Sequence, residues 1–209
     1  MLAFTLTLLL FLVTSAAPGC KKKAEMGKGE TGETSPTGDG RDAGAGGGGE
    51  TAPGEGEVKT ADVLLYFGVE RNGKLYLKAE RRSISYRDDL YLAVLRELVK
   101  GPSPGSGLRP VLPPTTRVLG TRLESGVLTV NLSKEVIIDA PSLATGAEGE
   151  VLALAALADT MTELPGVVKV KLLVEGKDRG MVDGRAVEDF WGHVGLPEQL
   201  ERNEALILK

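Results

Sequence analysis

The chain has 209 residues and a mildly acidic formal charge of −4, from 25 basic and 29 acidic side chains. Nucleic-acid-binding proteins usually gather Lys and Arg on one face, and the part that reads as a folded domain shows no such concentration, so nucleic acid is not an expected partner. Cys20 is the only cysteine and His193 the only histidine. These counts exclude an intramolecular disulfide and a zinc site of the usual kind, and we expect no metal or other cofactor.

Residues 1–19 have the character of a lipoprotein signal peptide. Residues 2–13 form an apolar run that is too short to span a bilayer, where roughly 20 residues are needed, but fits the hydrophobic region of a signal. Small residues then lead to Cys20 in an order that resembles a lipobox, whose cysteine receives diacylglycerol and an N-acyl chain. Cys20 is therefore the expected lipidation site, and the alternatives are a buried helix and a cleaved signal with an incidental cysteine.

Residues 20–57 predict a tether beyond the lipidated cysteine. The three lysines at 21–23 would lie beside the lipid headgroups, where each adds about 1 kcal/mol of attraction to anionic lipid. The rest is mostly Gly, Glu, Thr and Ala, including four glycines at 46–49. Such a chain cannot bury enough apolar surface to offset the entropy of ordering. We therefore expect a folded domain at 58–196, held outside the cytoplasm and near the membrane by a flexible coil.

The first half of this domain predicts a hairpin and then a helix. Residues 63–69 form a continuous apolar run and residues 74–80 alternate between apolar and polar. Asn72-Gly73 lies between them and is the strongest short signal for a hairpin turn. Apolar side chains then recur at helical spacing over 90–98, and Gly101-Pro102 predicts the end of this helix.

The second half repeats the order. Residues 118–123 and 127–132 flank Ser125-Gly126 and predict a second hairpin. An apolar stripe predicts a helix from about Ala147 to Leu164. Residues 168–174 then alternate in polarity and predict the last main strand.

The predicted order of main elements is β-β-α-β-β-α-β. Strands with one polar face and two amphipathic helices favour an α+β fold, a two-layer sandwich with a mixed or antiparallel sheet and both helices on one face. Shorter features complete the pattern: residues 136–138 are a short apolar extension, 176–180 a turn, and 185–187 a brief edge pairing. Residues 197–209 are expected to be a C-terminal tail with a short peripheral helix.

Several segments resemble a known family. They are VLLYFGVE, AVLRELVKGP, VLPPTTRVLG, VLTVNLSKEV and the long stretch 148–177. Together they are similar, over roughly 58–196, to the GerMN domain, the sporulation and spore-germination domain. The resemblance implies a small α+β domain on an envelope lipoprotein, and some such domains pack side by side, so an oligomer is possible for this chain. One copy is present here, whereas the germination protein that names the family has two.

Residues 68–74 nearly match a phosphate-binding loop. Leu75 stands where Ser or Thr would hold magnesium, and a strand rather than a helix is expected after Lys74. No helix N-terminus would then point at the loop, which removes the feature that binds phosphate. We interpret the segment as a hairpin turn.

His193 lies close to Asp189 and Trp191 in the sequence and could suggest a site. With no second histidine, the favoured interpretation is that Phe190 and Trp191 cover an open edge of the core while His193 caps a turn. A Ser-His or Cys-His catalytic pair would have to use this one histidine.

Other polar residues have ordinary explanations. The pairs Asp88-Asp89 and Glu148/Glu150 stand at predicted helix starts, where carboxylates complement the helix dipole. Ser133 has no lysine or histidine predictably beside it, so nothing indicates a hydrolase nucleophile.

The sequence thus predicts no catalytic, cofactor-binding or metal-binding residue, and Cys20 as the one modified position. We expect a lipid-anchored protein of the cell envelope, connected with sporulation or germination, whose domain binds an envelope protein partner without catalysis. The alternative is an envelope small-ligand-binding protein or hydrolase whose polar groups meet only in three dimensions. A deep polar pocket would favour the alternative, and a shallow surface with a free sheet edge would favour the interaction module.

Overall fold

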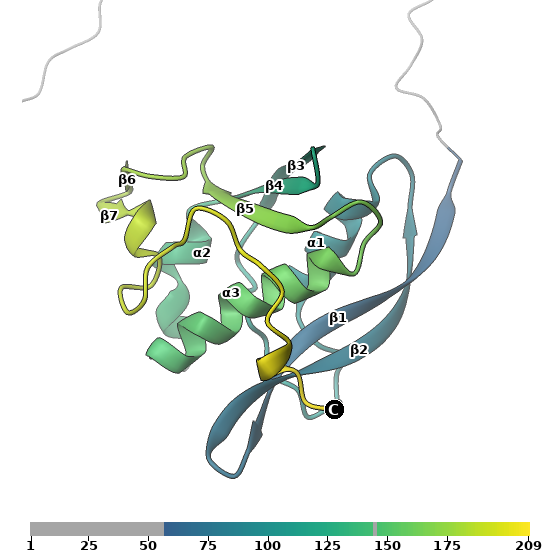
Figure 1. Cartoon of the computed structure of the whole chain (residues 1–209), viewed down its shortest axis with the longest axis horizontal. Helices are drawn as coiled ribbons and strands as arrows, with labels where there is room; N and C mark the ends of the chain where they lie inside the picture. Colours follow the sequence, from purple (N-terminus) through teal and green to yellow (C-terminus); the bar gives the residue numbers. More distant parts are fainter. Residues whose placement is uncertain (1–56, 144–145) are drawn as a thin grey trace, which may run out of the picture. The chain divides into compact units, whose positions relative to one another are not determined.

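The computed structural model describes residues 57–143 and 146–209 (Figure 1). The predicted signal peptide, Cys20 and the tether up to residue 56 lie outside the described residues, so their assignments stay predictions. Within the described part, no helix combines the length and apolarity that crossing a membrane requires.

The first hairpin forms as predicted. β1 (Lys59–Arg71) pairs antiparallel with β2 (Lys74–Tyr86). Asn72 and Gly73 in the turn have φ angles of 54° and 74°, and a two-residue turn with both φ angles positive matches the twist of the strands. Residues 65–68 of β1 are all buried. Both faces of this strand are therefore covered, which explains why its apolar run is continuous rather than alternating.

The two longer helices pack against this hairpin. α1 (Leu90–Lys100) begins after Asp89, whose carboxylate accepts from the Leu92 amide at 2.9 Å, and ends at Gly101, where φ is 91°. α3 (Ala147–Thr162) contacts β1, β2, β5 and α1. All its residues from 152 to 161 are buried. The sequence predicted one apolar stripe along this helix, but the structure buries every face of it between 152 and 161, because other elements surround it.

The remaining main strands form a second sheet in the order β3-β4-β5. β3 (Val118–Glu124) and β4 (Val127–Leu132) are the predicted antiparallel hairpin, and β5 (Lys169–Val174) joins β4 in parallel. Parallel neighbours need a long crossover, and here it contains α2 (Glu135–Ile138) and α3. The predicted apolar extension at 136–138 is thus helical.

The α+β class with mixed and antiparallel strands is confirmed, and the structure adds how the strands divide. β1-β2, β3-β4-β5 and the short pair β6 (Met181–Val182) and β7 (Arg185–Ala186) are separate sheets. α1 contacts β1, β2 and β3, so the helices lie against strands of both larger sheets rather than on one face of a single sheet. The outer side of β2 is occupied near the start of the strand, because the Leu75 amide donates to Glu148 and the Leu77 carbonyl accepts from the Leu208 amide.

The C-terminal residues are part of the folded unit. Figure 1 shows this segment crossing α3 from the side of β5 to the side of β2. Leu200 exchanges two backbone hydrogen bonds with Val170, at 3.0 and 2.7 Å, and the Leu208 amide donates to the Leu77 carbonyl at 2.7 Å. Only 204–206 is helical, as one short 3-10 turn. The segment expected as a peripheral tail therefore links the edges of two sheets.

Arg202 anchors this segment to α3 and β1. Its guanidinium donates to the Tyr66 hydroxyl at 3.1 Å and the Asp159 carbonyl at 3.2 Å, and pairs with the Glu163 carboxylate at 2.8 Å. The Asn203 amide donates to Asp159 Oδ1 at 2.7 Å, while Oδ2 is buried without a partner. Burial raises the pKa of the Asp159 carboxyl, although the Asn203 amide and Arg202 act in the opposite direction.

Asp159→Asn is expected to stabilise the protein at pH 7. A carboxyl whose pKa is raised by folding binds its proton more readily in the native state than in the unfolded chain. The free energy of unfolding therefore falls as the pH rises above about 4, the pKa of an aspartate carboxyl in the unfolded chain. Asparagine keeps an acceptor for Asn203 and removes the buried charge. The advantage of the variant in urea denaturation should grow between pH 4 and pH 7.

Asp178→Asn is the opposite-sign control, because Lys171 lowers the pKa of that exposed carboxyl. This second variant should show no stabilisation at pH 7. A less stable Asp159→Asn protein at pH 7 would contradict the role assigned to the unpartnered oxygen.

Candidate functional site

One face of the β3-β4-β5 sheet is directed away from the core. Burial alternates along β4 and β5, so that every second residue is buried and its neighbours are half-buried. The parallel register sets the half-buried residues side by side, residue 127 beside 169 and 131 beside 173. We call the part of this face that β4 and β5 contribute the open sheet face. It comprises Val127, Thr129, Asn131, Lys169, Lys171 and Leu173.

Two lysines give the open sheet face its charge. Lys169 Nζ lies 2.6 Å from a carboxylate oxygen of Glu201, and Lys171 Nζ lies 2.7 Å from one of Asp178. These contacts lower the pKa of the Glu201 and Asp178 carboxyls. Exposed ion pairs contribute only about 0–1 kcal/mol. These two ion pairs therefore contribute little to the stability of the domain.

The sheet also has one open edge. β3 is an outer strand, and within 57–143 and 146–209 no other strand pairs with its outer side, whereas Leu200 bridges the outer side of β5. Leu119 on β3 is 42% exposed. The pairing register shifts between Val118 and Gly120, which is an irregularity of the kind that bends edge strands. An outer strand offers backbone donors and acceptors to a strand from another molecule.

Among the described residues, the His193 side chain has no hydrogen bond or ion pair with an acid or a nucleophile. This side chain is exposed, and the backbone amide of His193 donates to the Glu150 carboxylate at 2.8 Å. Phe190 and Trp191 are buried and stacked with ring centres 5.0 Å apart, and the Trp191 indole donates to the Val136 carbonyl at 2.8 Å. The interpretation that these two aromatic residues cover the core is confirmed.

The carboxylates at helix starts have different roles. Asp89 caps α1 and also accepts from the Thr121 hydroxyl at 2.5 Å, which agrees with the interpretation made for it. Glu150 is fully buried and accepts from the backbone amides of His193 and Gly195 at 2.8 and 3.0 Å. The helix dipole alone does not explain Glu150, because its carboxylate also holds the loop at 193–195, which is distant in the sequence.

The other candidate groups also have structural partners. Ser133 is buried, and its hydroxyl accepts from the Arg117 amide at 2.8 Å, which holds the start of β3 against the end of β4. The loop at 68–74 is the β1-β2 turn, followed by a strand, so the hairpin interpretation is confirmed. No group of three or more His, Cys, Asp or Glu side chains in the described part of the chain could hold a metal ion.

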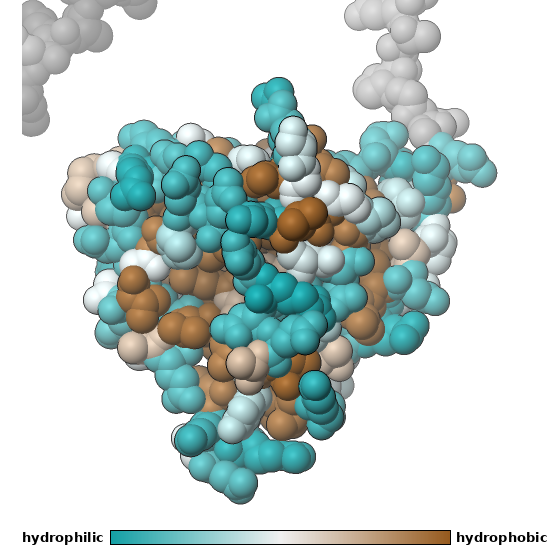
Figure 2. Space-filling model, viewed as in Figure 1, coloured by the Kyte–Doolittle hydropathy of each residue, from teal (hydrophilic) through white to brown (hydrophobic). Residues whose placement is uncertain are grey.

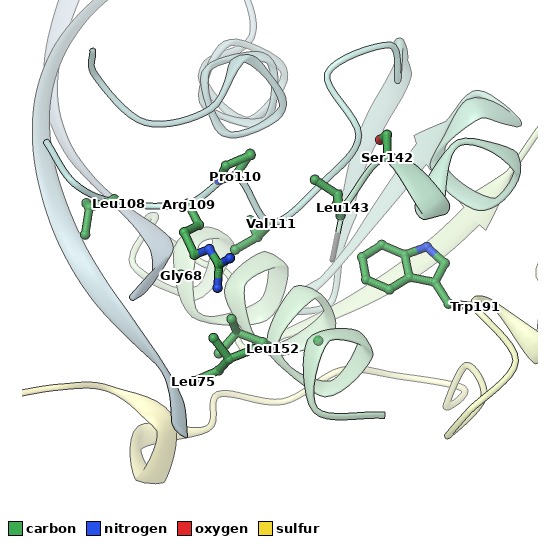
Figure 3. A pocket seen from close by; sticks show the side chains of 11 residues that line it. Gly68, Leu75, Leu108, Arg109, Pro110, Val111, Ser142, Leu143, Leu152 and Trp191 are labelled. Atoms are coloured by element: carbon green, nitrogen blue, oxygen red, sulfur yellow. The ribbon is translucent and has the colours of Figure 1, made fainter. Parts of the chain in front are cut away.

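A cavity of about 290 Å³ lies on another part of the domain (Figure 3). It is bounded by β1, the loop at 108–111, α3 and Trp191. Arg109 is the one charged residue of its lining. The apolar side chains that line it are Leu75, Leu108, Val111, Leu143, Leu152 and Trp191. Sequence reasoning missed this cavity, because its walls come from segments that no local pattern connects.

A broader hollow of about 550 Å³ separates α3 from the C-terminal segment. Val151 of α3 and Val194 of the preceding loop are among its lining residues and are 37% and 50% exposed. Figure 2 shows hydrophobic side chains reaching the surface on this side of the domain. Neither of these two hollows is a deep polar pocket.

Comparison with known proteins identifies the family. The model of a family described as Germane, sporulation and spore germination, matches residues 64–180. This match spans more than half of the chain. The chain belongs to the Germane family. The GerMN resemblance noted in the sequence is thereby confirmed.

The Germane domain is also similar to solved structures. The first GerMN domain of the sporulation protein GerM from Bacillus subtilis is 20% identical with a TM-score of 0.50, over 68% of this chain and 98% of that one, which shows a shared fold. The tandem GerMN domains of GerM are 22% identical with a TM-score of 0.43, over 69% of this chain and 47% of that one. A Clostridium perfringens protein described as a lipoprotein is 26% identical with a TM-score of 0.45, over 69% and 89%. No curated protein matches the chain.

The Germane match ends before β6 and β7. Trp191, which closes one side of the cavity, and the segment that crosses α3 therefore lie beyond the matched residues. In this chain Trp191 completes a wall of the cavity, and the C-terminal segment bonds to the edges of β5 and β2.

Proposed function

We propose that this Germane protein is an envelope lipoprotein, anchored through Cys20, whose domain binds a protein partner without catalysis. The observation that carries the proposal is the β3-β4-β5 sheet, which has one buried face, one charged face directed outward and an outer strand, β3, whose outer side pairs with no strand among the described residues. Such a surface can accept a strand at its edge and acidic side chains on its face. The family's description, sporulation and spore germination, supports a role of the complex in one of these processes.

The use of the polar side chains supports a non-catalytic role. Ser133, Asp89 and Glu150 each hold backbone groups in place, and the His193 side chain has no acid or nucleophile set against it in the described contacts. General acid–base or nucleophilic catalysis needs such groups within hydrogen-bond reach of one another. The proposed lipid and tether would keep the domain near its partner and raise their effective concentration.

Reversing the charge of the open sheet face tests the partner surface. Lys169→Glu with Lys171→Glu would repel acidic side chains of a partner and would also repel Glu201 and Asp178. We expect capture of the partner from cross-linked membranes to fall by about tenfold, equivalent to about 1.4 kcal/mol. Lys78→Glu, an exposed charge reversal on β2, is the matched control and should capture normally.

A double variant that folds and captures its partner as well as the wild-type protein would exclude the open sheet face as the contact. His193→Ala offers a separate check, since its side chain is exposed and its contact to Glu150 is made by the backbone. A folded His193→Ala protein without cellular function would favour the enzyme or ligand-binding alternative.

Cys20→Ala tests the anchor. Stable membrane attachment needs at least two acyl chains, and the alanine variant can carry none at this position. We expect the membrane-bound fraction after cell fractionation to fall by at least about tenfold, because Lys21–Lys23 alone provide only about 1 kcal/mol each. Ser15→Ala, which keeps the cysteine, should stay in the membrane pellet. A Cys20→Ala protein that pellets as firmly as wild type would contradict lipid anchoring.

A further inference from the structure

We infer that the cavity beside Arg109 binds a single-chain amphiphile with an anionic head group. This site shares no residue with the open sheet face, so the inference is independent of the proposed partner surface. Figure 3 shows Arg109 and Trp191 on different sides of the cavity, with Leu143 between them and with Leu75 and Leu152 beside Arg109. The arrangement provides one place for a charge and one for an apolar chain.

The walls select an apolar ligand of modest size. Leu75, Val111, Leu143 and Leu152 line the cavity, and the Ser142 hydroxyl and the Arg109 guanidinium are its polar side-chain groups. Its volume of about 290 Å³ is at the lower end of the range for ligand sites, roughly 300–1,000 Å³. A lipid with two acyl chains is too large for this space, and a strongly polar molecule would lose hydrogen bonds to water that these walls cannot replace.

Arg109 is placed to receive the head group. Its backbone exchanges two hydrogen bonds with Gly68, at 3.0 and 2.7 Å, which fixes the residue at the edge of β1. Its guanidinium lies 3.3 Å from the Glu70 carboxylate, and these two side chains are 52% and 58% exposed. A pair so exposed is weak. A carboxylate or phosphate can therefore replace Glu70, and guanidinium binds either anion through two parallel hydrogen bonds.

The opposite side of the cavity is rigid and apolar. The Trp191 indole is held by its bond to the Val136 carbonyl and by stacking on Phe190. The backbone at Gly68 lies close to this wall, because a Cβ atom there would be 3.2 Å from Leu152 Cδ2, which is a tight contact. The end of an acyl chain whose head group is bound at Arg109 would thus lie near the indole ring.

Trp191 is the only tryptophan of the chain and can report binding in the full-length protein. The probe is 11-bromoundecanoate, kept below its micellar concentration, whose terminal bromine quenches indole fluorescence on contact. We expect saturable quenching. Arg109→Gln should weaken binding roughly tenfold, the effect of losing one charge-assisted hydrogen bond. The matched control Arg117→Gln, an exposed arginine outside the cavity, should bind normally.

Two further arms define the ligand class. Decyl phosphate should displace the probe, and this displacement should depend on Arg109, because the site recognises an anion at the end of a single chain rather than a carboxylate alone. Decanol, which has the same chain without the charge, should displace the probe at least tenfold less well. Leu75→Phe places a larger side chain in the cavity on a strand position that favours aromatic residues, and should abolish quenching while the thermal melt stays cooperative.

Absent or unsaturable quenching would overturn the inference. So would equal binding by wild type, Arg109→Gln and Leu75→Phe, which would place the probe elsewhere on the protein. The Lys169→Glu, Lys171→Glu protein should bind the probe like wild type, so failure of the proposed partner surface is distinguishable from failure of this site.

Discussion

Leu157→Ala is expected to lower the free energy of unfolding by about 2–5 kcal/mol. Leu157 is 1% exposed and lies in the middle of α3, where every neighbour from 152 to 161 is buried. α3 contacts strands of both larger sheets, so a cavity at this position cannot be closed by moving one surface element. Equilibrium denaturation with urea measures the loss. Leu157→Asp should not fold, because it would bury an unpaired charge.

Val151→Ala is the matched control on the same helix. Val151 is 37% exposed, so its truncation should cost no more than about 0.5–1 kcal/mol. Equal losses from Val151→Ala and Leu157→Ala would show that α3 is not packed on all sides. That result would contradict the central position of this helix.

Glu150→Ala is expected to be nearly as damaging, at about 2–4 kcal/mol. The carboxylate is fully buried and accepts from the amides of His193 and Gly195. Alanine leaves both part-buried donors without their acceptor, and each such loss costs about 1–2 kcal/mol, within the lower part of the range for unsatisfied buried groups. Loss of the Glu150 bonds should also loosen the loop that carries Trp191, so its fluorescence should shift toward that of an exposed indole. Urea denaturation and the emission maximum of Trp191 measure the two effects.

Two companion variants separate hydrogen bonding from other causes. Glu150→Gln keeps one oxygen acceptor and should lose less stability than Glu150→Ala. Glu148→Ala removes an exposed carboxylate from the same helix turn, where it accepts from the Leu75 amide, and should cost about 1 kcal/mol or less. If Glu148→Ala were as damaging as Glu150→Ala, the helix dipole would be the better explanation for both residues.

Residues 57–209 thus offer two unrelated surfaces. The open sheet face is charged and shallow, and its lysines have exchangeable ion pairs. The cavity beside Arg109 is apolar and bounded by segments from β1 to Trp191. A domain that binds a partner with one surface and an amphiphile with the other would bring together the two components of an envelope, protein and lipid.

Local sequence determined the elements of the fold. Asn72-Gly73 and Ser125-Gly126 adopt the positive φ angles of two-residue hairpins, so both turns were predictable from residue type alone. Gly101 ends α1 for the same conformational reason. The alternation along residues 168–174 correctly predicted a strand with one buried face, so the polar residues of its other face could be assigned to the surface from their spacing.

The tertiary structure alone decided which elements meet. Nothing near Glu150 in the sequence indicates that two amides more than forty residues away lie 2.8 and 3.0 Å from its carboxylate. Residues 197–209 have no strong periodic pattern, yet Leu200 and Leu208 occupy the edges of β5 and β2. Periodicity and turn chemistry depend on neighbours along the chain. Sheet edges, buried carboxylates and cavities depend on contacts between distant segments, which form only when the whole core is packed.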